Sequence, residues 1–313
     1  MKVFLLGKIG GITHWLEDAA GGLRTAGHQV RLGVTRLAWL SPTLERALAP
    51  TTAARIARRI SAFGPDLILA VGGYHAPRTV LETIAALPGR PPLVGWVGDG
   101  FGEDANCLSR SYDLVGYTDT GLLARHVALG FTAASLYLPH AVDPRRAPAR
   151  PPQARRPGLV LVANPTPHRR AVVGGLERPI ALHGPAWTPS PGIDHAIHRG
   201  RLPPRKVMRL YEHFAAALNI RNEFNVVHGL NQRNFDPCLA GAAVFAEDQP
   251  DLPLCFEPGL EVAAYASVAA LNDLHGRLRR EPAWAAEIGT RGRRRVLAGH
   301  TFAHRLDALV ARL

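Results

Sequence analysis

The sequence predicts an α/β fold of two Rossmann-like domains, each built from a parallel sheet with helices on its faces. First, short apolar runs alternate with helical patterns along the whole chain, as they do in doubly wound sheets. Second, the Pro- and Arg-rich segment Pro144–Gly158 separates two such series. Third, 313 residues are long for a single core, and two domains of about 150 residues fit that length.

The first series begins with the apolar run Lys2–Leu6, which is expected to be a strand ended by a glycine. Trp15–Ala26 carries its apolar residues at helical spacing. A Gly-Pro pair ends the helix expected over Arg55–Phe63. Asp66–Val71 is a continuous apolar run, as buried parallel strands are. The other expected elements are the strands Gln29–Val34, Leu93–Val97, Leu114–Tyr117 and Ser135–Leu138 and the helices Thr79–Leu87 and Gly121–Leu129, the last of which Thr118-Asp119-Thr120 can cap.

After the Pro-rich segment the alternation resumes with the strand Leu159–Ala163 and a polar loop. Asp236 followed by Pro237 suits an N-cap with proline in the first turn, so a helix is expected from Pro237. The other expected elements are the strands Ile180–His183, Ala217–Ile220 and Ala242–Ala246 and the helices Pro204–Phe214, Ser267–Arg279, Trp284–Ala298 and His300–Leu313.

Ligands of such sheets bind at the carboxyl ends of the strands. The loops expected at those ends are Lys8–His14, Gly72–His75, Gly98–Asp104, Asn164–Arg170, Gly184–Trp187 and Val227–Asp236.

The composition is that of a globular protein, with 47% hydrophobic and 20% charged residues. No apolar run approaches the ~20 residues of a membrane helix, and Val3–Leu6 is too short for a signal-peptide core. We therefore expect a cytoplasmic protein without a transmembrane segment. Cys107, Cys238 and Cys255 lack C-x-x-C spacing, which indicates reduced thiols rather than disulfides or a zinc site.

The net charge of +12 comes almost entirely from arginine, and this balance suits an anionic partner, namely nucleic acid, an anionic lipid or a phosphorylated substrate. Nucleic acid is not the expected partner, because no stacking aromatic residues are interleaved with the arginine clusters. A phosphorylated substrate fits the charge equally well.

The most informative stretch is Asn231–Gly241, N-Q-R-N-F-D-P-C-L-A-G, with Gly259–Tyr265, G-L-E-V-A-A-Y, behind it. A polar loop here leads into a short helix and then into an apolar strand. A helix N-terminus at the mouth of a strand is suited to hold a diphosphate and a ribose. The stretch therefore favours an enzyme that uses a nucleotide-sugar.

In its ordered motifs the chain resembles GT-B glycosyltransferases, and most nearly the spore-maturation-type branch close to the retaining family 4. The matching motifs are T-H-W-L-E-D-A-A-G-G-L-R-T-A-G-H-Q-V, P-D-L-I-L-A-V-G-G and L-P-H-A-V-D-P in the first half, and H-G-P-A-W, L-N-I, N-Q-R-N-F-D-P-C-L-A-G-A, P-G-L-E-V-A-A-Y and H-T-F-A-H-R-L in the second.

The resemblance implies two Rossmann-like domains that face each other across a cleft. Residues 1–146 would form the N-terminal, acceptor-side domain and residues 158–299 the C-terminal, nucleotide-sugar-binding domain. Residues 300–313 would form a helix that crosses back to the N-terminal domain. The implied activity moves a sugar from a nucleotide-diphosphate donor to an unknown acceptor, which could be a small molecule, a glycan or a protein.

Family 4 enzymes carry two glutamates eight positions apart, and the second commonly binds the ribose of the nucleotide. Aligned on the motif, Asp236 takes the second position and His228 takes the first, so both glutamates are replaced. The resemblance implies that Asp236 contacts the ribose and that His228 contacts the sugar or phosphate. A helix cap for Asp236 and a surface location for His228 are the alternatives.

The resemblance also places a phosphate-binding pair at Arg169 and Arg170, and a fixed Arg233 beside a helix N-terminus could neutralise the leaving diphosphate. Surface or structural roles are the alternative for each arginine. The remaining donor-side candidates are Gly10, Gly11, Asn164, Asn231 and Glu261.

On the acceptor side, Asp99 lies between two glycines at a strand end and is the candidate to bind the acceptor or act as a base. His14 follows the Gly-Gly pair and could touch either substrate. Tyr74 and His75 are further acceptor-side candidates. A turn aspartate and a capping histidine are the structural alternatives.

The chain contains no D-x-D triad, which favours a metal-independent transferase without a cofactor, in which arginines and helix dipoles stabilise the diphosphate. The resemblance implies that the enzyme retains the anomeric configuration. Two alternatives remain open, a GT-B nucleotide-sugar epimerase and a catalytically degenerate GT-B binding or scaffold protein. A nicotinamide dehydrogenase is disfavoured, because no G-x-G-x-x-G opens either half.

Overall fold

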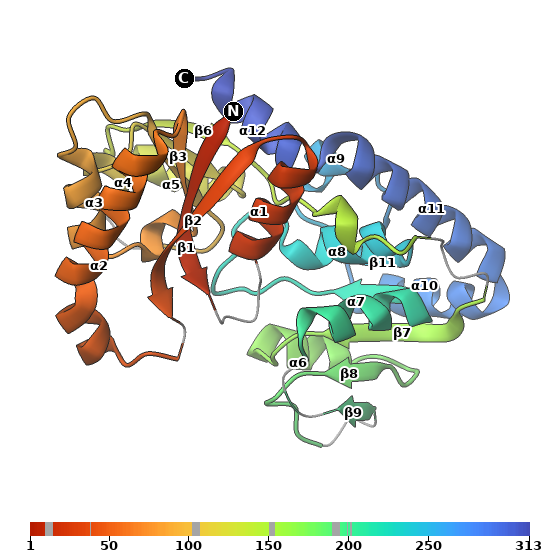
Figure 1. Cartoon of the computed structure of the whole chain (residues 1–313). Coiled ribbons are helices and arrows are strands. Elements are labelled where there is room, and N and C mark those ends of the chain that lie inside the picture. The colour runs from red at the N-terminus through yellow and green to blue at the C-terminus, as the bar shows by residue number, and fades with distance from the viewer. Residues whose placement is uncertain are drawn as a thin grey trace. The chain divides into compact units, whose positions relative to one another are not determined.

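The computed structural model describes residues 1–9, 15–37, 39–101, 107–149, 154–189, 195–198, 200 and 202–313. The chain forms two compact units, Met1–Pro139 with Phe302–Leu313, and His140–Thr301 (Figure 1). Each unit contains a six-stranded sheet in which all neighbouring strands are parallel. The predicted α/β class with two Rossmann-like sheets is therefore confirmed.

The sheet of the first unit has the strand order β2-β1-β3-β4-β5-β6. Its strands are β1 (Lys2–Ile9), β2 (Gln29–Leu37), β3 (Leu67–Val71), β4 (Leu93–Val97), β5 (Leu114–Tyr117) and β6 (Ala134–Tyr137). Its helices are α1 (Trp15–Thr25), α2 (Pro42–Phe63), α3 (Arg78–Ala85), α4 (Cys107–Arg110), α5 (Thr120–Ala128) and α12 (Phe302–Val310), with the 3-10 turn η1 (Gly73–His75).

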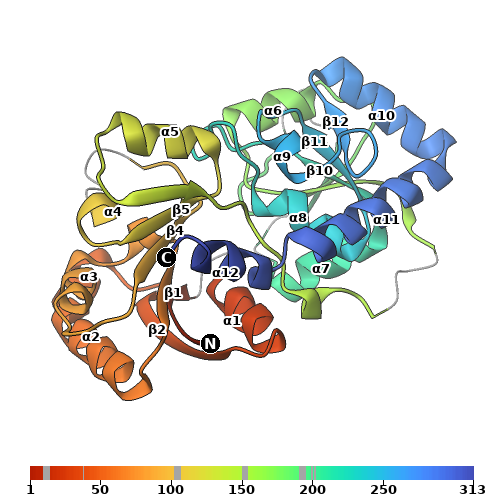
Figure 2. The same ribbon diagram turned by 90° about the horizontal axis from the view of Figure 1, so that it is seen from above.

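Helices cover both faces of this sheet because its strands are apolar on both sides. Phe4 and Leu6 of β1 share one core with residues of α2, α3 and α5. On the opposite face the Trp96 ring lies 5.8 Å from the Phe302 ring and 4.9 Å from the Trp15 ring, so α12 packs beside α1 (Figure 2). The last helix of the chain thus completes the core of the first unit.

The sheet of the second unit has the strand order β12-β11-β10-β7-β8-β9. Its strands are β7 (Arg156–Val162), β8 (Ala181–His183), β9 (Ala196–His198), β10 (Phe214–Asn219), β11 (Ala243–Glu247) and β12 (Ala263–Tyr265). Its helices are α6 (Pro167–Gly174), α7 (Pro204–His213), α8 (Gln232–Ala240), α9 (Leu252–Cys255), α10 (Val268–Arg280) and α11 (Pro282–Gly299), with the 3-10 turn η2 (Pro144–Arg146).

One face of the second sheet packs on α6 and α10, whose Val173 and Leu271 are fully buried. Helices α7, α8 and α11 pack on one another and on β10 or β11. The close approach of α11 requires Gly289, since a Cβ there would lie 2.3 Å from the carbonyl oxygen of Gly241. These layers hold the loops at the carboxyl ends of β7, β10 and β11 in place.

Two sequence predictions of secondary structure are wrong, and two short strands were not predicted. Helix α8 begins at Gln232 rather than Pro237, because Asn231 is its N-cap and forms a capping box with Asn234. Asp236 is therefore not a helix cap, and Pro237 lies inside the helix. Helix α2 begins at Pro42, after the N-cap Ser41, rather than at Arg55. The short edge strands β9 and β12 had no sequence prediction, because three residues carry too little periodicity.

Within the part of the chain that the structure describes, no helix combines the length and the apolar character needed to cross a membrane.

Candidate functional site

The order of the strands indicates where each sheet would bind a ligand, at the carboxyl ends of its strands. In the second unit the order reverses between β7 and β10, and in the first unit it reverses between β1 and β3. Ligands of doubly wound sheets bind outside the carboxyl ends of the strands at such reversals. In both units, sequence-predicted site residues lie in the loops that follow these strands.

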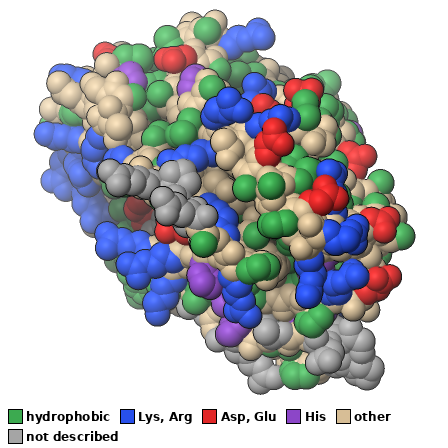
Figure 3. All heavy atoms as spheres, turned by 90° about the vertical axis from the view of Figure 1, so that its right-hand side faces the viewer, with side chains coloured by type: hydrophobic (Ala, Val, Ile, Leu, Met, Phe, Trp, Pro, Cys, Tyr) green, Lys and Arg blue, Asp and Glu red, His purple; other side chains and the backbone are tan. Residues whose placement is uncertain are grey.

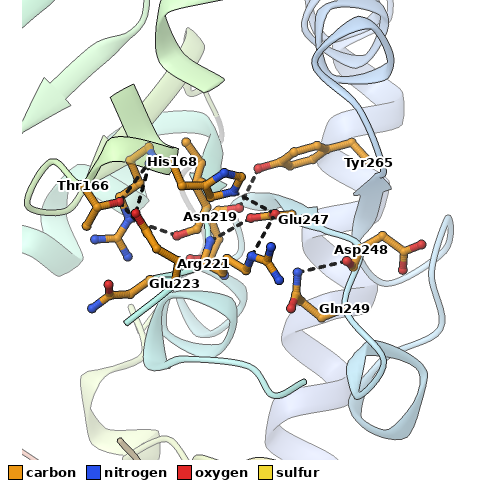
Figure 4. Close-up of polar contacts among 12 residues, drawn as sticks. Thr166, His168, Asn219, Arg221, Glu223, Glu247, Asp248, Gln249 and Tyr265 are labelled. Carbon is orange, nitrogen blue, oxygen red and sulfur yellow. Dashed lines mark hydrogen bonds and ion pairs between the residues drawn. The ribbon is translucent and has the colours of Figure 1, made fainter. Parts of the chain in front are cut away.

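In the second unit, Glu223 follows β10 and holds the start of α6 beside β7 (Figure 4). Its carboxylate accepts a 2.6 Å hydrogen bond from the hydroxyl of Thr166 and a 3.0 Å bond from the backbone N–H of His168. Burial by itself raises the pKa of Glu223, but these hydrogen bonds outweigh it and hold that pKa below its ordinary value. The loops after the two strands are thereby fixed to each other.

Glu247 ends β11 and joins the same cluster (Figure 4). One of its carboxylate oxygens lies 2.9 Å from Nε2 of His168, and the other accepts a 2.9 Å hydrogen bond from the backbone N–H of Arg221. The Arg221 Nε lies 3.5 Å from the same carboxylate. Glu247 thus links the carboxyl ends of β7, β10 and β11.

Arg169 is the most buried basic side chain of this edge, with 2% of its surface exposed. Its Nε donates to the carbonyl oxygen of Ile220 at 3.2 Å and its Nη1 donates to that of Asn164 at 2.9 Å. The buried Nη2 has no hydrogen-bond partner among the residues that the structure describes. A buried guanidinium with an unused donor is ready to bind an anion.

Burial, reinforced by the positive charge of Arg233 and opposed by Glu223 and Glu247, lowers the pKa of Arg169 from 12.5 to about 9. The guanidinium therefore stays protonated at neutral pH. Arg233 lies on the first turn of α8, so the two arginines add positive charge from two different helices. This arrangement favours a ligand with more than one negative charge.

Asp236 lies one turn further along α8 and is 9% exposed. Its carboxylate accepts a 2.8 Å hydrogen bond from Gln232 and lies 3.5 Å from a guanidinium nitrogen of Arg146. Burial raises its pKa, against the opposing effects of Arg146, Gln232 and Arg233. Because Arg233 acts on both Asp236 and Arg169, the three predicted residues lie within electrostatic reach of one another.

Asn231 serves α8 as its N-cap, since its side chain accepts a 2.9 Å hydrogen bond from the backbone N–H of Arg233. Its own backbone N–H donates at 3.3 Å to Asn234, whose side-chain oxygen also accepts from Asn219 at the end of β10. The cap therefore ties the start of α8 to the sheet edge. The side chain of Asn231 thus has a structural role as a helix cap.

The other predicted donor-side side chains that the structure describes make separate contacts or are exposed. Arg170 donates a 3.1 Å hydrogen bond to the carbonyl oxygen of Ala186 and its guanidinium lies 5.5 Å from the Trp187 ring centre. Glu261 accepts from the backbone N–H of Glu257 at 2.8 Å and lies 3.7 Å from Arg295. The side chains of Asn164 and His228 are exposed.

In the first unit, the structure brings the acceptor-side candidates Tyr74, His75 and Asp99 together beyond β3 and β4. The Tyr74 hydroxyl donates to Asp99 at 2.5 Å, and the Tyr74 and His75 ring centres are 3.8 Å apart. Burial, reinforced by Asp99, raises the pKa of Tyr74 above its ordinary value. Burial, reinforced by Lys8 and Arg36 and opposed by Asp99, lowers the pKa of His75 to about 4. At neutral pH His75 is therefore a neutral hydrogen-bonding group.

Gly10, Gly11 and His14 lie outside the residues that the structure describes. Among the described residues no group of three or more His, Cys, Asp or Glu side chains is arranged to hold a metal ion.

The residues that link the strand ends at this edge were not among the predicted site residues; they are Thr166, His168, Arg221, Glu223 and Glu247. The rule that ligands bind at the carboxyl ends of strands also applies to these residues. Arg221 and Glu223 follow the expected strand Ala217–Ile220, and Glu247 directly follows Ala242–Ala246. Their charge and position were the available signal. Lys8 and Arg36, which act on His75, also lie at the ends of their strands, β1 and β2.

The structure has the GT-B fold that solved glycosyltransferases share, and part of the chain is similar to a glycosyltransferase family. Residues 167–311, from α6 into α12, match the family described as glycosyl transferase-like. No curated protein matches the sequence.

Solved glycosyltransferase structures match the whole chain. The Anabaena protein Alr3699/HepE, in complex with UDP-glucose, is 15% identical with a TM-score of 0.69, and the match covers 100% of both chains. Sucrose-phosphate synthase from Thermosynechococcus elongatus is 13% identical with a TM-score of 0.67, over 99% of this chain and 98% of that one. AviGT4, a glycosyltransferase involved in avilamycin A biosynthesis, is 16% identical with a TM-score of 0.64, over 99% and 96%. These matches confirm the predicted fold.

Proposed function

We propose that the protein binds a nucleoside diphosphate sugar at the carboxyl edge of the second sheet and transfers the sugar to an acceptor. The observation that carries the proposal is the buried Arg169 guanidinium at the reversal of strand order, whose Nη2 has no hydrogen-bond partner among the described residues. Leaving a buried donor unsatisfied costs on the order of 1–3 kcal/mol, and a diphosphate oxygen removes this cost with a charge-assisted hydrogen bond.

Uridine diphosphate is the proposed nucleotide, because similar structures contain UDP or UDP-glucose. In this proposal Arg169 and Arg233 bind the diphosphate, and Asp236 accepts hydrogen bonds from the ribose hydroxyls. A carboxylate oxygen has two lone pairs, so the existing bonds of Asp236 to Gln232 and Arg146 leave acceptor capacity.

We further propose that transfer retains the anomeric configuration and requires neither a metal ion nor a cofactor. The absence of a D-x-D triad from the sequence and the two arginines beside Asp236 support a metal-independent course. Retention rests on the resemblance to family 4. The configuration of the product, measured by NMR, and the rate in the presence of EDTA test these two parts separately.

On the acceptor side we propose that Asp99 accepts a hydrogen bond from the acceptor hydroxyl. Tyr74 already donates to one oxygen of this carboxylate and fixes its orientation. Asp99→Asn is expected to slow transfer without changing UDP affinity, because Asp99 belongs to the first unit.

The test of donor binding is calorimetric titration of the purified protein with UDP, GDP, ADP and dTDP. UDP is expected to bind tightest. Replacing Arg169 by Met is expected to weaken UDP binding about tenfold to a hundredfold, since a hydrogen bond to a charged group contributes roughly 1.5–3 kcal/mol. Arg169→Lys keeps the charge but loses the planar guanidinium. Its affinity for UDP is expected to lie between those of the wild type and Arg169→Met.

The matched control is Arg277→Gln, which removes an arginine of α10 that forms an ion pair with Glu281. It is expected to bind UDP like the wild type. The proposal is wrong if no nucleoside diphosphate binds the folded protein, or if Arg169→Met binds UDP as tightly as the control does.

A further inference from the structure

The first third of α2 and the loop before it carry large apolar side chains in contact with solvent. Trp39 is 67% exposed, Leu44 is 48% exposed and Leu48 is 44% exposed. These three residues lie within ten positions of one another, and Leu44 and Leu48 are one helical turn apart. In Figures 1 and 2, α2 lies at the periphery of the first unit.

The exposed face of α2 continues from these leucines into arginines. At about 3.6 residues per turn, Leu44, Leu48, Arg55, Arg58 and Arg59 fall within one stripe along the helix. The opposite stripe, which includes Ile56 and Ile60, is buried in the core. All three arginines of the stripe are exposed.

No acid of α2 offsets this charge on the exposed stripe. Glu45 is the sole acidic residue in the sequence of the helix, and its carboxylate lies 2.9 Å from Nε of Arg36. The exposed stripe is therefore apolar at its start and basic toward its end, and α2 itself places no acidic residue on it. Its complement is a surface that is apolar beneath a layer of negative charge.

We propose that α2 and the loop that begins at Trp39 form a reversible docking surface for an anionic phospholipid membrane. Trp39, Leu44 and Leu48 enter the boundary between headgroups and acyl chains, where tryptophan and leucine are favoured. Arg55, Arg58 and Arg59 pair with lipid phosphates. A nucleic acid would match the arginines but offers no apolar layer for the leucines.

Charge alone does not select this surface, because Lys and Arg side chains also gather on the face of the molecule that Figure 3 shows. The distinguishing feature of α2 is the combination of exposed apolar residues and arginines on one stripe. This inference does not depend on the proposed transferase activity.

The test is co-sedimentation of the full chain with vesicles of phosphatidylcholine alone or mixed with phosphatidylglycerol, at low and at raised salt. The wild type is expected to bind the mixed vesicles and to be released by salt. The double variant L44S/L48S is expected to bind about tenfold more weakly, or about 1.4 kcal/mol. The triple variant R55Q/R58Q/R59Q is expected to bind about a hundredfold more weakly, because each arginine near an anionic surface contributes to binding.

The matched control carries the same kinds of change in the other unit, L254S with R279Q, R280Q and R294Q. Leu254 is 54% exposed, and the three arginines are exposed as well. The control is expected to bind vesicles like the wild type. In a second readout, wild-type tryptophan emission is expected to shift to the blue on mixed vesicles, and W39F is expected to lose this shift.

Three results would overturn the proposal. These are failure of the wild type to bind the mixed vesicles, equal losses in the control and the α2 variants, and unchanged binding by L44S/L48S. The last result would mean that the surface is electrostatic without apolar insertion.

Discussion

At the scale of single residues, burial decides what the charged side chains of the two sheet edges can do. His75 and Arg169 both have a lowered pKa, and burial is the main cause for each. The consequence differs, because a pKa of about 4 makes His75 neutral at pH 7 whereas a pKa of about 9 leaves Arg169 charged. The cluster of Tyr74, His75 and Asp99 in the first unit therefore presents a neutral imidazole, and the edge of the second sheet presents a buried cation.

The pKa of His75 gives a prediction about pH. The folded protein resists protonation of His75 below its usual 6.5, so the unfolded chain binds the proton more tightly between pH 6.5 and about 4. The free energy of unfolding is expected to fall as the pH falls through this window. NMR titration of the folded protein is expected to place the His75 midpoint near 4, and His75→Gln is expected to weaken the pH dependence of stability.

Two neighbouring substitutions test the cause of this pKa. Lys8→Met is expected to raise the His75 midpoint, because the charge of Lys8 lowers it, and Asp99→Asn is expected to lower it. A midpoint near 6.5 in the folded wild type would contradict the structure around His75.

At the scale of elements, α8 is held by its first turn at one end and by α11 along its side. The capping box of Asn231 and Asn234 satisfies backbone donors that the helix itself leaves unpaired. At the other end of α8, the C-cap Gly241 lies in close contact with Gly289 of α11. The position of Arg233 and Asp236 thus follows from contacts made at both ends of their helix.

Removing the cap is expected to destabilise the second unit. Asn231→Ala is expected to lower the free energy of unfolding by about 1 kcal/mol, because the cap satisfies an otherwise unpaired backbone N–H. Urea denaturation measures this loss. Asn231→Asp keeps a capping oxygen and serves as the control, so equal losses in the two variants would argue against the capping role.

A methyl group on α11 tests the packing of the layers. Gly289→Ala is expected to cost about 1–3 kcal/mol, because its Cβ would lie 2.3 Å from a backbone oxygen that cannot easily move. Gly299→Ala is the control in the same helix, since nothing lies within 4 Å of its Cβ. Equal melting temperatures of the two variants would show that the helices are not this close.

At the scale of the whole molecule, the chain ends in the unit where it began. Phe302 packs on Trp96 of β4 and against Gly22 of α1, and Arg305 donates a 2.6 Å hydrogen bond to the carbonyl oxygen of Pro139. The stability of the first unit therefore depends on residues that follow the whole of the second unit in the sequence.

Phe302→Ala is expected to destabilise the first unit by about 3–5 kcal/mol, because Phe302 is 2% exposed and its loss leaves a cavity. Hydrogen exchange is expected to show lost protection in β1 and β4, with β10 and β11 unchanged. Val310→Ala, at a position that is 41% exposed, is the control and is expected to change stability by less than about 0.5 kcal/mol. Loss of protection in β10 and β11 alone would contradict the assignment of α12 to the first unit.

The sequence by itself determined the alternation of strands and helices and the edge of each sheet where the polar loops gather. These depend on local patterns, such as the apolar run of β3 and the cap of α5, where Asp119 accepts from the N–H groups of Gly121 and Leu122. The start of α8 was misplaced because Asp236-Pro237 and the Asn231 capping box are both credible helix starts, and only the second is made.

Only the tertiary structure decided which of two adjacent arginines is buried. Arg169 donates to the carbonyl oxygen of Ile220, 51 residues further along the chain, whereas Arg170 contacts Ala186 and Trp187. The tertiary structure likewise brings Glu247 to His168 and Tyr74 to Asp99, and each of these pairs connects segments at or beyond the ends of different strands. Burial and pairing of this kind arise when distant segments pack together, and no local pattern in the sequence encodes them.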